Sequence, residues 1–166
     1  MMGLFDKLFG KKEEINPNHV YAPMAGEAVA ISEIPDPTFS EGLLGNGIAI
    51  KPTDGKVYAP VNGTVDTAFD TGHAVSLISD NGIEILIHVG LETVGLNGAP
   101  FQMKVKNGQK VKKGDILLIA DLEAIKAAGL PTITPVLICN TDDYSTFNVT
   151  TGKTVTSGDV VIEVGK

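Results

Sequence analysis

The sequence lacks arginine entirely, because all 13 of its basic residues are lysines. Any mechanism that depends on an arginine finger or a bidentate arginine clamp is therefore excluded for this chain. The formal net charge is −7 at pH 7. A chain with this charge is a poor ligand for a nucleic-acid backbone, so we expect no nucleic-acid partner. A basic or polar protein surface is a better match.

Cysteine is almost absent as well. The single residue, Cys139, cannot form a disulfide within the chain, which favours a reducing compartment and a cytoplasmic location. We interpret Cys139 as a small core side chain rather than a reactive thiol. The sequence shows no secretory signal, and none of its apolar runs is long enough to span a bilayer.

Aromatic residues make up only 5% of the chain and tryptophan is missing, whereas glycine and proline occur 19 and 9 times. This balance favours an all-β domain over a helical bundle. Short apolar runs alternate with turn signals, as is typical of an antiparallel β-sandwich or barrel, and short helices are predicted at 36–44 and 121–130. The predicted strands are 20–23, 28–33, 47–51, 57–59, 63–69, 73–79, 83–89, 101–106, 116–119, 134–139 and 160–164.

Two internal echoes indicate pseudo-repeated strand-turn-strand units. The segment "YAPMAGEAV" at 21–29 returns as "YAPVNGTVD" at 58–66, and "GQKVKKGDIL" at 108–117 returns as "GKTVTSGDVV" at 152–161. The alternative is a chance similarity of turn chemistry. The shared spacing favours a pseudo-symmetric architecture, which we expect to form one β-sandwich domain over residues 19–166.

The start of the chain differs from the rest. Four apolar residues between positions 4 and 9 recur at helical spacing beside lysines, and "INPNH" follows as a linker. Residues 1–18 are therefore predicted to be a flexible amphipathic segment and linker. Residues 1–12 could make weak contact with an anionic membrane surface, and the alternative is a frayed tail.

Two patterns suggest a phosphate-binding loop and a closed zinc site, but each lacks a residue that the site requires. The segment "TTGKT" resembles the end of a phosphate-binding loop, but Phe147 occupies the position that requires glycine. His73 and His88 could approach each other if 73–79 and 83–89 form a hairpin around "SDNG". Two imidazoles are too few for a closed zinc site, so a metal at this pair would need a further ligand.

His88 stands at the end of the most apolar predicted strand, in "GIEILIHVG". Strand parity puts the three isoleucines and Val89 on one face and His88 on the other, and Gly90 allows another group to come close. In a symmetric hairpin register residue 73 pairs with 89, which brings His73 near His88. His19, in the linker, is interpreted as incidental.

A histidine pair suits phosphoryl transfer, because neutral imidazole is a good nucleophile near neutral pH. The transferred group carries spread negative charge and needs hydrogen-bond donors at its oxygens. A second imidazole, the Thr71 hydroxyl and backbone N–H groups could supply them. The alternative is that both histidines are ordinary packed or surface residues.

A long series of motifs resembles the glucose-family enzyme IIA proteins of the bacterial phosphoenolpyruvate-dependent sugar phosphotransferase system. The series runs in order through residues 19–164 and includes "YAP.AGE", "PDP.F..G..G.GIAI.P", "TGHA", "G..ILIHVG..TV.L.G.PF" and "V..GQ.VK.GD.L...DL". The resemblance implies a free-standing enzyme IIA, which is a phosphotransferase that acts as a phosphohistidine carrier in sugar transport and requires no cofactor.

The resemblance also assigns roles to individual residues. It implies that His88 accepts a phosphoryl group on Nε2 from the histidine-containing phosphocarrier protein and passes it to a cysteine in the IIB domain of a sugar permease. His73 corresponds to the second active-site histidine, and Thr71 to the residue whose hydroxyl helps to hold it. The implied partner-binding positions are Phe39, Leu43, Leu44, Phe69 and Val94, with an acidic rim at Asp36 and Glu92.

Further expectations concern partners and rival functions. By the resemblance, zinc could bind between His73 and His88 if a partner lends a carboxylate, and regulatory targets could bind the unphosphorylated form. We expect a monomer. One rival is a biotinyl- or lipoyl-like carrier, because "KVYAPVNGTV" at 56–65 is similar to such barrels, although Lys56 lacks the neighbouring methionine and the hairpin. Another is a purely regulatory protein with an inactive site.

Overall fold

The computed structural model describes residues 15–166, so most of the predicted N-terminal segment, including the predicted amphipathic element, lies outside the described residues. The strands are β1 (His19–Tyr21), β2 (Gly26–Ala30), β3 (Asn46–Pro52), β4 (Lys56–Tyr58), β5 (Gly63–Ala68), β6 (Ala74–Ser79), β7 (Glu84–His88), β8 (Phe101–Met103), β9 (Lys110–Val111), β10 (Ile116–Ala120), β11 (Thr134–Ile138), β12 (Thr146–Val149), β13 (Lys153–Val155) and β14 (Val160–Gly165). The helices are α2 (Pro37–Ser40) and α3 (Leu122–Ala127), with 3-10 turns η1 (Ile31–Glu33), η2 (Thr93–Leu96) and η3 (Thr141–Asp143).

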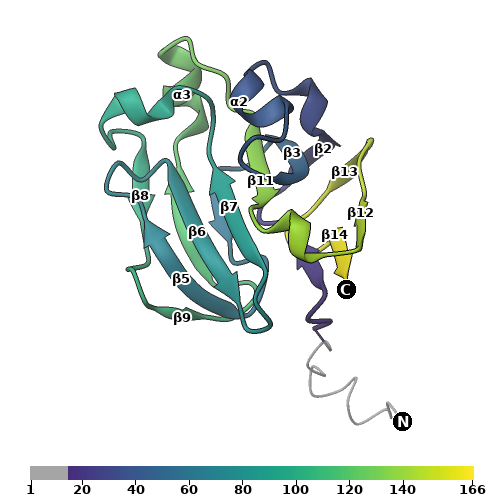
Figure 1. Cartoon of the computed structure of the whole chain (residues 1–166). Helices are drawn as coiled ribbons and strands as arrows, with labels where there is room; N and C mark the ends of the chain where they lie inside the picture. Colours follow the sequence, from purple (N-terminus) through teal and green to yellow (C-terminus); the bar gives the residue numbers. More distant parts are fainter. Residues whose placement is uncertain (1–14) are drawn as a thin grey trace, which may run out of the picture.

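The strands form one large sheet and two small ones. The large sheet has eight strands in the order β13-β2-β3-β11-β7-β6-β5-β9, and the small sheets are β1-β14-β12 and β4-β10-β8. The strand pairs are antiparallel throughout the described residues. In Figure 1, α2 and α3 lie at the same end of the sandwich, above β3, β11 and β7. The predicted all-β class, with two short helices, is confirmed.

The sequence echoes correspond to repeated structural units. The first echo supplies β1 with β2 and then β4 with β5, and the second supplies β9 with β10 and then β13 with β14. The first pair of units exchanges equivalent hydrogen bonds: the Tyr21 N–H donates to the Pro60 carbonyl at 3.0 Å and the Tyr58 N–H to the Pro23 carbonyl at 2.7 Å. The likeness of the two segments is therefore structural and not a chance similarity of turns.

The strand order of the large sheet shows the same symmetry. It reads alike from both ends when β13 is matched with β9, β2 with β5, β3 with β6 and β11 with β7. One half is contiguous, at 56–120, and is inserted between the two parts of the other half, 19–52 and 134–165. Strands β7 and β11 pair where the halves meet. The strand that carries His88 is therefore central in the sheet, with a neighbour on each side.

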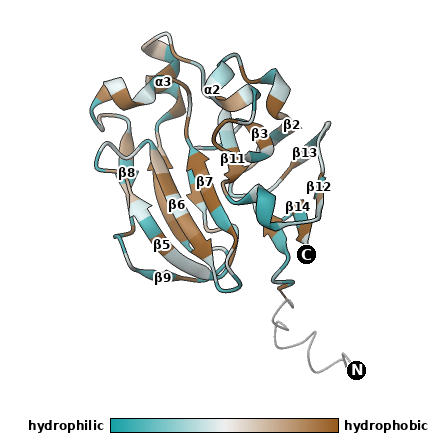
Figure 2. Ribbon diagram, viewed as in Figure 1, coloured by the Kyte–Doolittle hydropathy of each residue, from teal (hydrophilic) through white to brown (hydrophobic). Residues whose placement is uncertain are grey.

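The core confirms the parity of β7. Ile85 and Ile87 are at most 1% exposed, and Glu84 on the opposite face is exposed. Leu86 and His88 are half-buried. Figure 2 shows the hydrophobic colouring of β6 and β7. Burial of each large aliphatic side chain contributes about 1.5–3 kcal/mol to the stability of the fold, so strand β7, which ends in His88, is well anchored in the core.

Both helices are shorter than predicted. Helix α2 begins after Asp36, whose carboxylate accepts the Thr38 N–H at 3.0 Å, and it ends before Gly42, which has a φ of 74°. A left-handed residue stops a helix, and leucines 43 and 44 therefore lie in a loop. Helix α3 is capped by Asp121 and followed by Gly129 at φ 78°.

Three strands were not predicted, and one side chain was placed wrongly. Strands β9, β12 and β13 have two to four residues each, too few for a period of two to stand out. Cys139 is exposed, contrary to the core position predicted from its apolar neighbours, because it follows the last residue of β11.

Within residues 15–166, no helix has the length and apolar character needed to cross a membrane.

Candidate functional site

His88 is the last residue of β7, and its ring is fixed by one backbone group. Its Nδ1 lies 2.8 Å from the carbonyl oxygen of Gly90. A carbonyl oxygen only accepts hydrogen bonds, so in the neutral ring the proton resides on Nδ1. The lone pair is then on Nε2, which is the nitrogen free to act as a nucleophile or a ligand.

Gly90 allows this contact because the chain turns sharply after β7. Its φ is 77°, and a Cβ on it would lie 2.7 Å from Thr93 Cγ2 and 2.8 Å from the Pro131 carbonyl oxygen. A side chain at this position would therefore be in a strained left-handed conformation and would also clash with a backbone oxygen. The glycine two residues after His88 is therefore required by close packing.

His73 lies immediately before β6, across the hairpin from His88. Ala74 pairs with His88 and Val75 with Ile87, which is the predicted register, and the Val89 N–H donates to the His73 carbonyl at 2.7 Å. The two imidazole centroids are 4.9 Å apart, with an angle of 77° between the ring planes. The structure therefore brings the two predicted histidines into direct contact.

Thr71 and the turn at Gly72 set the orientation of the His73 ring. The Thr71 hydroxyl lies 2.6 Å from His73 Nδ1. Gly72 has a φ of 69°, and a Cβ on it would lie 2.6 Å from the Cβ of Phe101. Parity in a regular ladder would direct the His73 side chain into the core with that of Val89. The turn before the ladder begins explains why its ring instead lies against that of His88.

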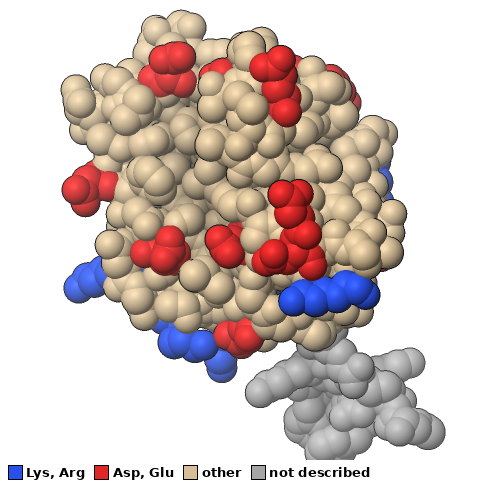
Figure 3. All heavy atoms as spheres, viewed as in Figure 1, with Lys and Arg blue, Asp and Glu red and all other residues tan. Residues whose placement is uncertain are grey.

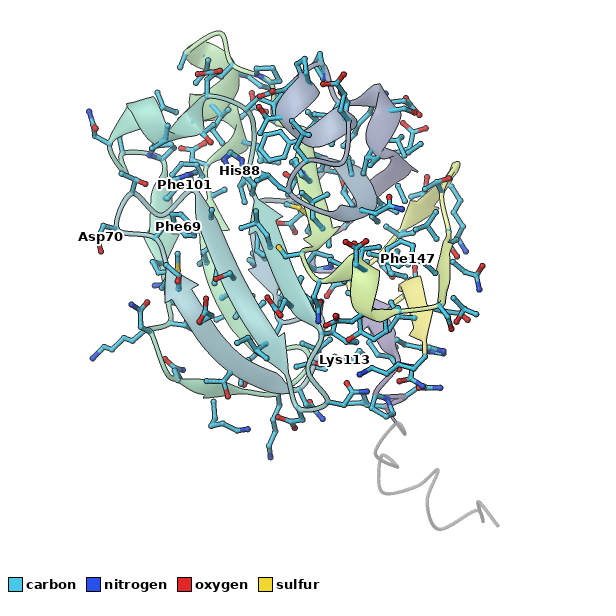
Figure 4. All side chains as sticks on the ribbon, viewed as in Figure 1. Phe69, Asp70, His88, Phe101, Lys113 and Phe147 are labelled. Carbon is cyan, nitrogen blue, oxygen red and sulfur yellow. The ribbon has the colours of Figure 1, made fainter. Side chains whose placement is uncertain are left out.

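Aromatic rings pack against both histidines. The ring of Phe39, from α2, is 5.0 Å from that of His88, and the ring of Phe69 is 5.4 Å from that of His73. Phe39 is only 6% exposed, so it supports the site from beneath, whereas Phe69 is half-buried. Figure 4 shows Phe69, Phe101 and His88 together at the upper end of the sandwich, away from Phe147 and Lys113.

The remaining predicted partner-binding residues are exposed or half-buried, and the charges of Asp36 and Glu92 act on His88. Leu43, Leu44 and Val94 are 72%, 42% and 51% exposed, an unusual degree for large apolar side chains. Asp36 is half-buried and Glu92 is exposed. Figure 3 shows acidic side chains at the upper edge of the face and again across its middle, with an uncharged area between them.

Burial keeps both imidazoles neutral. Burial, together with the neighbouring His88, lowers the pKa of His73 from 6.5 to about 4. Burial also lowers the pKa of His88, and this is opposed by hydrogen bonding to the backbone of Gly90 and of His88 itself, and by the charges of Asp36 and Glu92. Neutral rings have a free lone pair, so both are ready to act as nucleophile, acceptor or ligand at neutral pH.

Metal binding at this pair would need help from outside the described chain. Within residues 15–166, no group of three histidine, cysteine, aspartate or glutamate side chains is arranged to hold a metal ion. The two imidazoles could supply two ligands, which is fewer than zinc requires.

Thr93 lies near the site, and although it stands in the motif "HVG..TV", the sequence assigned it no role. It is fully buried, and its hydroxyl donates to the Val89 carbonyl at 2.6 Å. The motif marks the position, but it does not show that the hydroxyl is buried or which carbonyl it contacts. The carbonyl of Gly90 is equally invisible, although the glycine itself was a usable signal.

The fold and the site define a class of protein. It is a β-sandwich with two neutral imidazoles in contact at the end of a central strand, with two phenylalanine rings and two acidic groups around them. The residues that match the model of the phosphoenolpyruvate-dependent sugar phosphotransferase system EIIA 1 family are 18–144. The chain belongs to this family, and is accordingly a phosphocarrier component of sugar transport.

Relatives cover nearly the whole chain. A protein named PTS system glucose-specific EIIA component, from Bacillus anthracis, is 44% identical over 159 residues, which is 96% of each chain. A protein of the same name from Staphylococcus epidermidis is 42% identical over 163 residues, covering 97% of this chain and 98% of the relative. The solved glucose permease IIA from Mycoplasma capricolum superposes with a TM-score of 0.80 at 36% identity, covering 87% and 93% of the two chains.

Proposed function

We propose that His88 carries the phosphoryl group. In this proposal Nε2 accepts the group from the histidine-containing phosphocarrier protein and passes it to a cysteine in the IIB domain of a sugar permease. The observation that carries the proposal is the 2.8 Å contact between Nδ1 and the Gly90 carbonyl, which leaves Nε2 as the nucleophile beside a second imidazole.

Uptake is an in-line exchange of one P–N bond for another, and delivery to the cysteine exchanges the P–N bond of His88 for a P–S bond. The Nε2 lone pair of His88 attacks phosphorus, the P–N bond of the donor breaks, and the bonding electrons return to the imidazole of the donor. In the second step a thiolate attacks and the electrons return to His88 Nε2. The proton stays on Nδ1, hydrogen-bonded to the Gly90 carbonyl, in both steps, so the ring needs no proton transfer.

His73 and Thr71 would stabilise the transferred group. If the Thr71 hydroxyl donates to His73 Nδ1, the proton of the neutral ring is on Nε2. That N–H is available to a phosphoryl oxygen on the adjacent His88. The low pKa of His73, about 4, keeps it neutral, so it donates a hydrogen bond without holding the anionic group as tightly as a full positive charge would.

The docking surface of both partners would be the exposed apolar side chains next to the histidines. Leu43, Leu44 and Val94 expose apolar surface that costs little free energy to desolvate. Phe39 packs against the His88 ring and Phe69 against the His73 ring. The carboxylates of Asp36 and Glu92 suit a partner with basic groups around its own reactive residue. Lacking arginine, the chain depends on partners for any guanidinium group at the interface.

Other partners follow from the same site. Transfer requires no cofactor, and zinc could bind between His73 and His88 only where a partner supplies a carboxylate ligand. The unphosphorylated surface could also bind regulatory targets. We propose that the protein acts as a cytoplasmic monomer, with weak membrane-surface contact through residues 1–12.

Labelling with phosphoenolpyruvate and the two general upstream proteins tests the proposal. We expect acid-labile label on the unaltered chain and none on His88→Ala. His73→Gln should accept phosphate but release it poorly to the IIB domain. His19→Gln is the matched control, because His19 lies far along the chain in β1, and it should label normally. Label that persists on His88→Ala would overturn the proposal, and normal turnover of His73→Gln would remove the role given to His73.

A further inference from the structure

The Gly90 carbonyl accepts the hydrogen bond of His88 Nδ1, so the contacts that fix this carbonyl also favour one tautomer. Rotation of the Gly90 peptide by a modest angle would remove the acceptor from Nδ1. The two neutral tautomers of imidazole have similar intrinsic stability, so the hydrogen bond to one nitrogen decides between them. Loss of this contact would let the proton populate Nε2, the nitrogen that must be free for attack.

Three contacts hold the Gly90 peptide in place. The Leu91 N–H, on the far side of that peptide, donates to the Pro131 carbonyl at 3.2 Å. The Gly90 Cα is in close contact with Thr93 Cγ2, because a Cβ added there would lie 2.7 Å from it. On the near side, the Val89 carbonyl accepts the Thr93 hydroxyl at 2.6 Å. Thr93 therefore takes part in two of the three contacts.

Val89 connects Thr93 to the second histidine as well. Its N–H donates to the His73 carbonyl at 2.7 Å, and its carbonyl accepts from Thr93. Thr93 is 0% exposed, so no water competes for the hydroxyl, and its loss would leave a buried carbonyl without this partner. One hydroxyl is thus linked through a single residue to the backbone of both imidazoles.

We propose that Thr93 is a positioning residue, whose hydroxyl and methyl group lock the Val89-Gly90 turn so that His88 keeps its proton on Nδ1 and its lone pair on Nε2. The proposal rests on the proposed function of His88. Thr93 does not touch the reacting atoms; it acts through the Val89 and Gly90 carbonyls. Its effect should therefore be visible in the tautomer of His88 as well as in transfer rates.

The experiment compares variants that separate the hydroxyl from the methyl group. Thr93→Val keeps the shape and loses the hydroxyl, and Thr93→Ser keeps the hydroxyl and loses the methyl. Thr134→Val is the matched control, because Thr134 is also 0% exposed and its hydroxyl donates to a backbone carbonyl, that of Thr132, at 2.9 Å. For each full-length chain we would measure the nitrogen-15 spectrum of the His88 ring at neutral pH and the single-turnover rate of phosphoryl uptake.

We expect Thr93→Val to show both His88 tautomers and to take up phosphate about tenfold more slowly, whereas Thr93→Ser should stay close to the unaltered protein. Thr134→Val should lose stability but keep one tautomer and the normal rate. If Thr93→Val does not fold, Thr93→Ala and Thr93→Ser give the second comparison, because they differ by one hydroxyl.

The proposal is overturned if Thr93→Val keeps the proton on Nδ1 alone, or if its tautomers mix while the uptake rate stays within about twofold. A rate loss that Thr134→Val reproduces without a tautomer change would also overturn it, since general destabilisation would then explain the loss. If the unaltered chain takes up no phosphate, the proposed function fails, but the tautomer comparison still decides the role of Thr93.

Discussion

Replacement of Gly90 by alanine perturbs the site at its tightest point. The new Cβ would lie 2.7 Å from Thr93 Cγ2 and 2.8 Å from the Pro131 carbonyl oxygen, on a residue with a φ of 77°. The Thr93 methyl group belongs to a fully buried side chain and the Pro131 oxygen to the backbone, so neither can move aside cheaply. The turn itself must shift, and with it the carbonyl that binds His88 Nδ1.

The expected cost has two parts. A left-handed conformation costs a residue with a Cβ roughly 1–2 kcal/mol. Overpacking against atoms that cannot relax adds about 1–3 kcal/mol. Gly90→Ala should therefore lower the free energy of unfolding by about 2–5 kcal/mol, which a domain with a total stability of about 5–15 kcal/mol can survive.

Gly129→Ala separates the two parts. Gly129 follows α3 at a φ of 78°, nearly that of Gly90, but a Cβ on it would have no atom within 4 Å. This control should show the backbone cost alone. Urea denaturation gives the free energy of unfolding for both variants, and phosphoryl uptake by the same proteins reports on the site. We expect only Gly90→Ala to take up phosphate slowly.

A difference of less than about 0.5 kcal/mol between the two variants would refute the packing argument. Normal phosphoryl uptake by Gly90→Ala would refute the link between this turn and His88.

Three further predictions concern charge and docking. The free energy of unfolding should be greatest above pH 6.5 and fall toward pH 4 by up to about 1.4 kcal/mol per pH unit for each proton, because folding lowers the pKa of His73 to about 4 and the unfolded chain binds the proton first. Urea denaturation across this range should show a flatter pH profile for His73→Gln, and an unchanged profile would contradict the assignment to His73. Asp36→Asn removes a charge that raises the pKa of His88, so an NMR titration should show that pKa lower, and an equal or higher value would count against this coupling. Leu43 is 72% exposed, so Leu43→Gln should change the free energy of unfolding by less than about 0.5 kcal/mol but slow phosphoryl transfer from the donor protein. If the transfer rate depends on donor concentration as in the unaltered chain, Leu43 is not part of the docking surface.

Much of the fold was predictable because its signals are local. Alternation in "IEILIHV" sets which side chains of β7 enter the core, and the turn "SDNG" with the symmetric register places 75 opposite 87, as observed. The echoes at 21–29 and 58–66 predicted repeated units, and the structure has them as β1-β2 and β4-β5. These features depend on neighbours along the chain, so the sequence carries them directly.

Short polar strands and helix ends were less predictable. Strand β9 has only Lys110 and Val111, and it exists because β5 provides a partner for it. Helix α2 ends at Ser40, because the chain turns at Gly42, which the apolar pattern through Leu44 concealed. Phe39 was expected at the partner surface, and packing against Leu91 and Ile133, far along the sequence, buries it beneath His88.

The sequence by itself determined that this chain is an all-β member of the EIIA family, with His88 at the end of a buried strand and His73 across the hairpin. Only the tertiary structure decided what those imidazoles can do. The His88 tautomer depends on the Gly90 carbonyl, and that turn is held by Thr93 and by Pro131 from the loop before β11. Periodicity encodes which face a side chain occupies, whereas the direction of a ring within that face is set by contacts between segments far apart in the chain, and single-sequence patterns do not record these contacts.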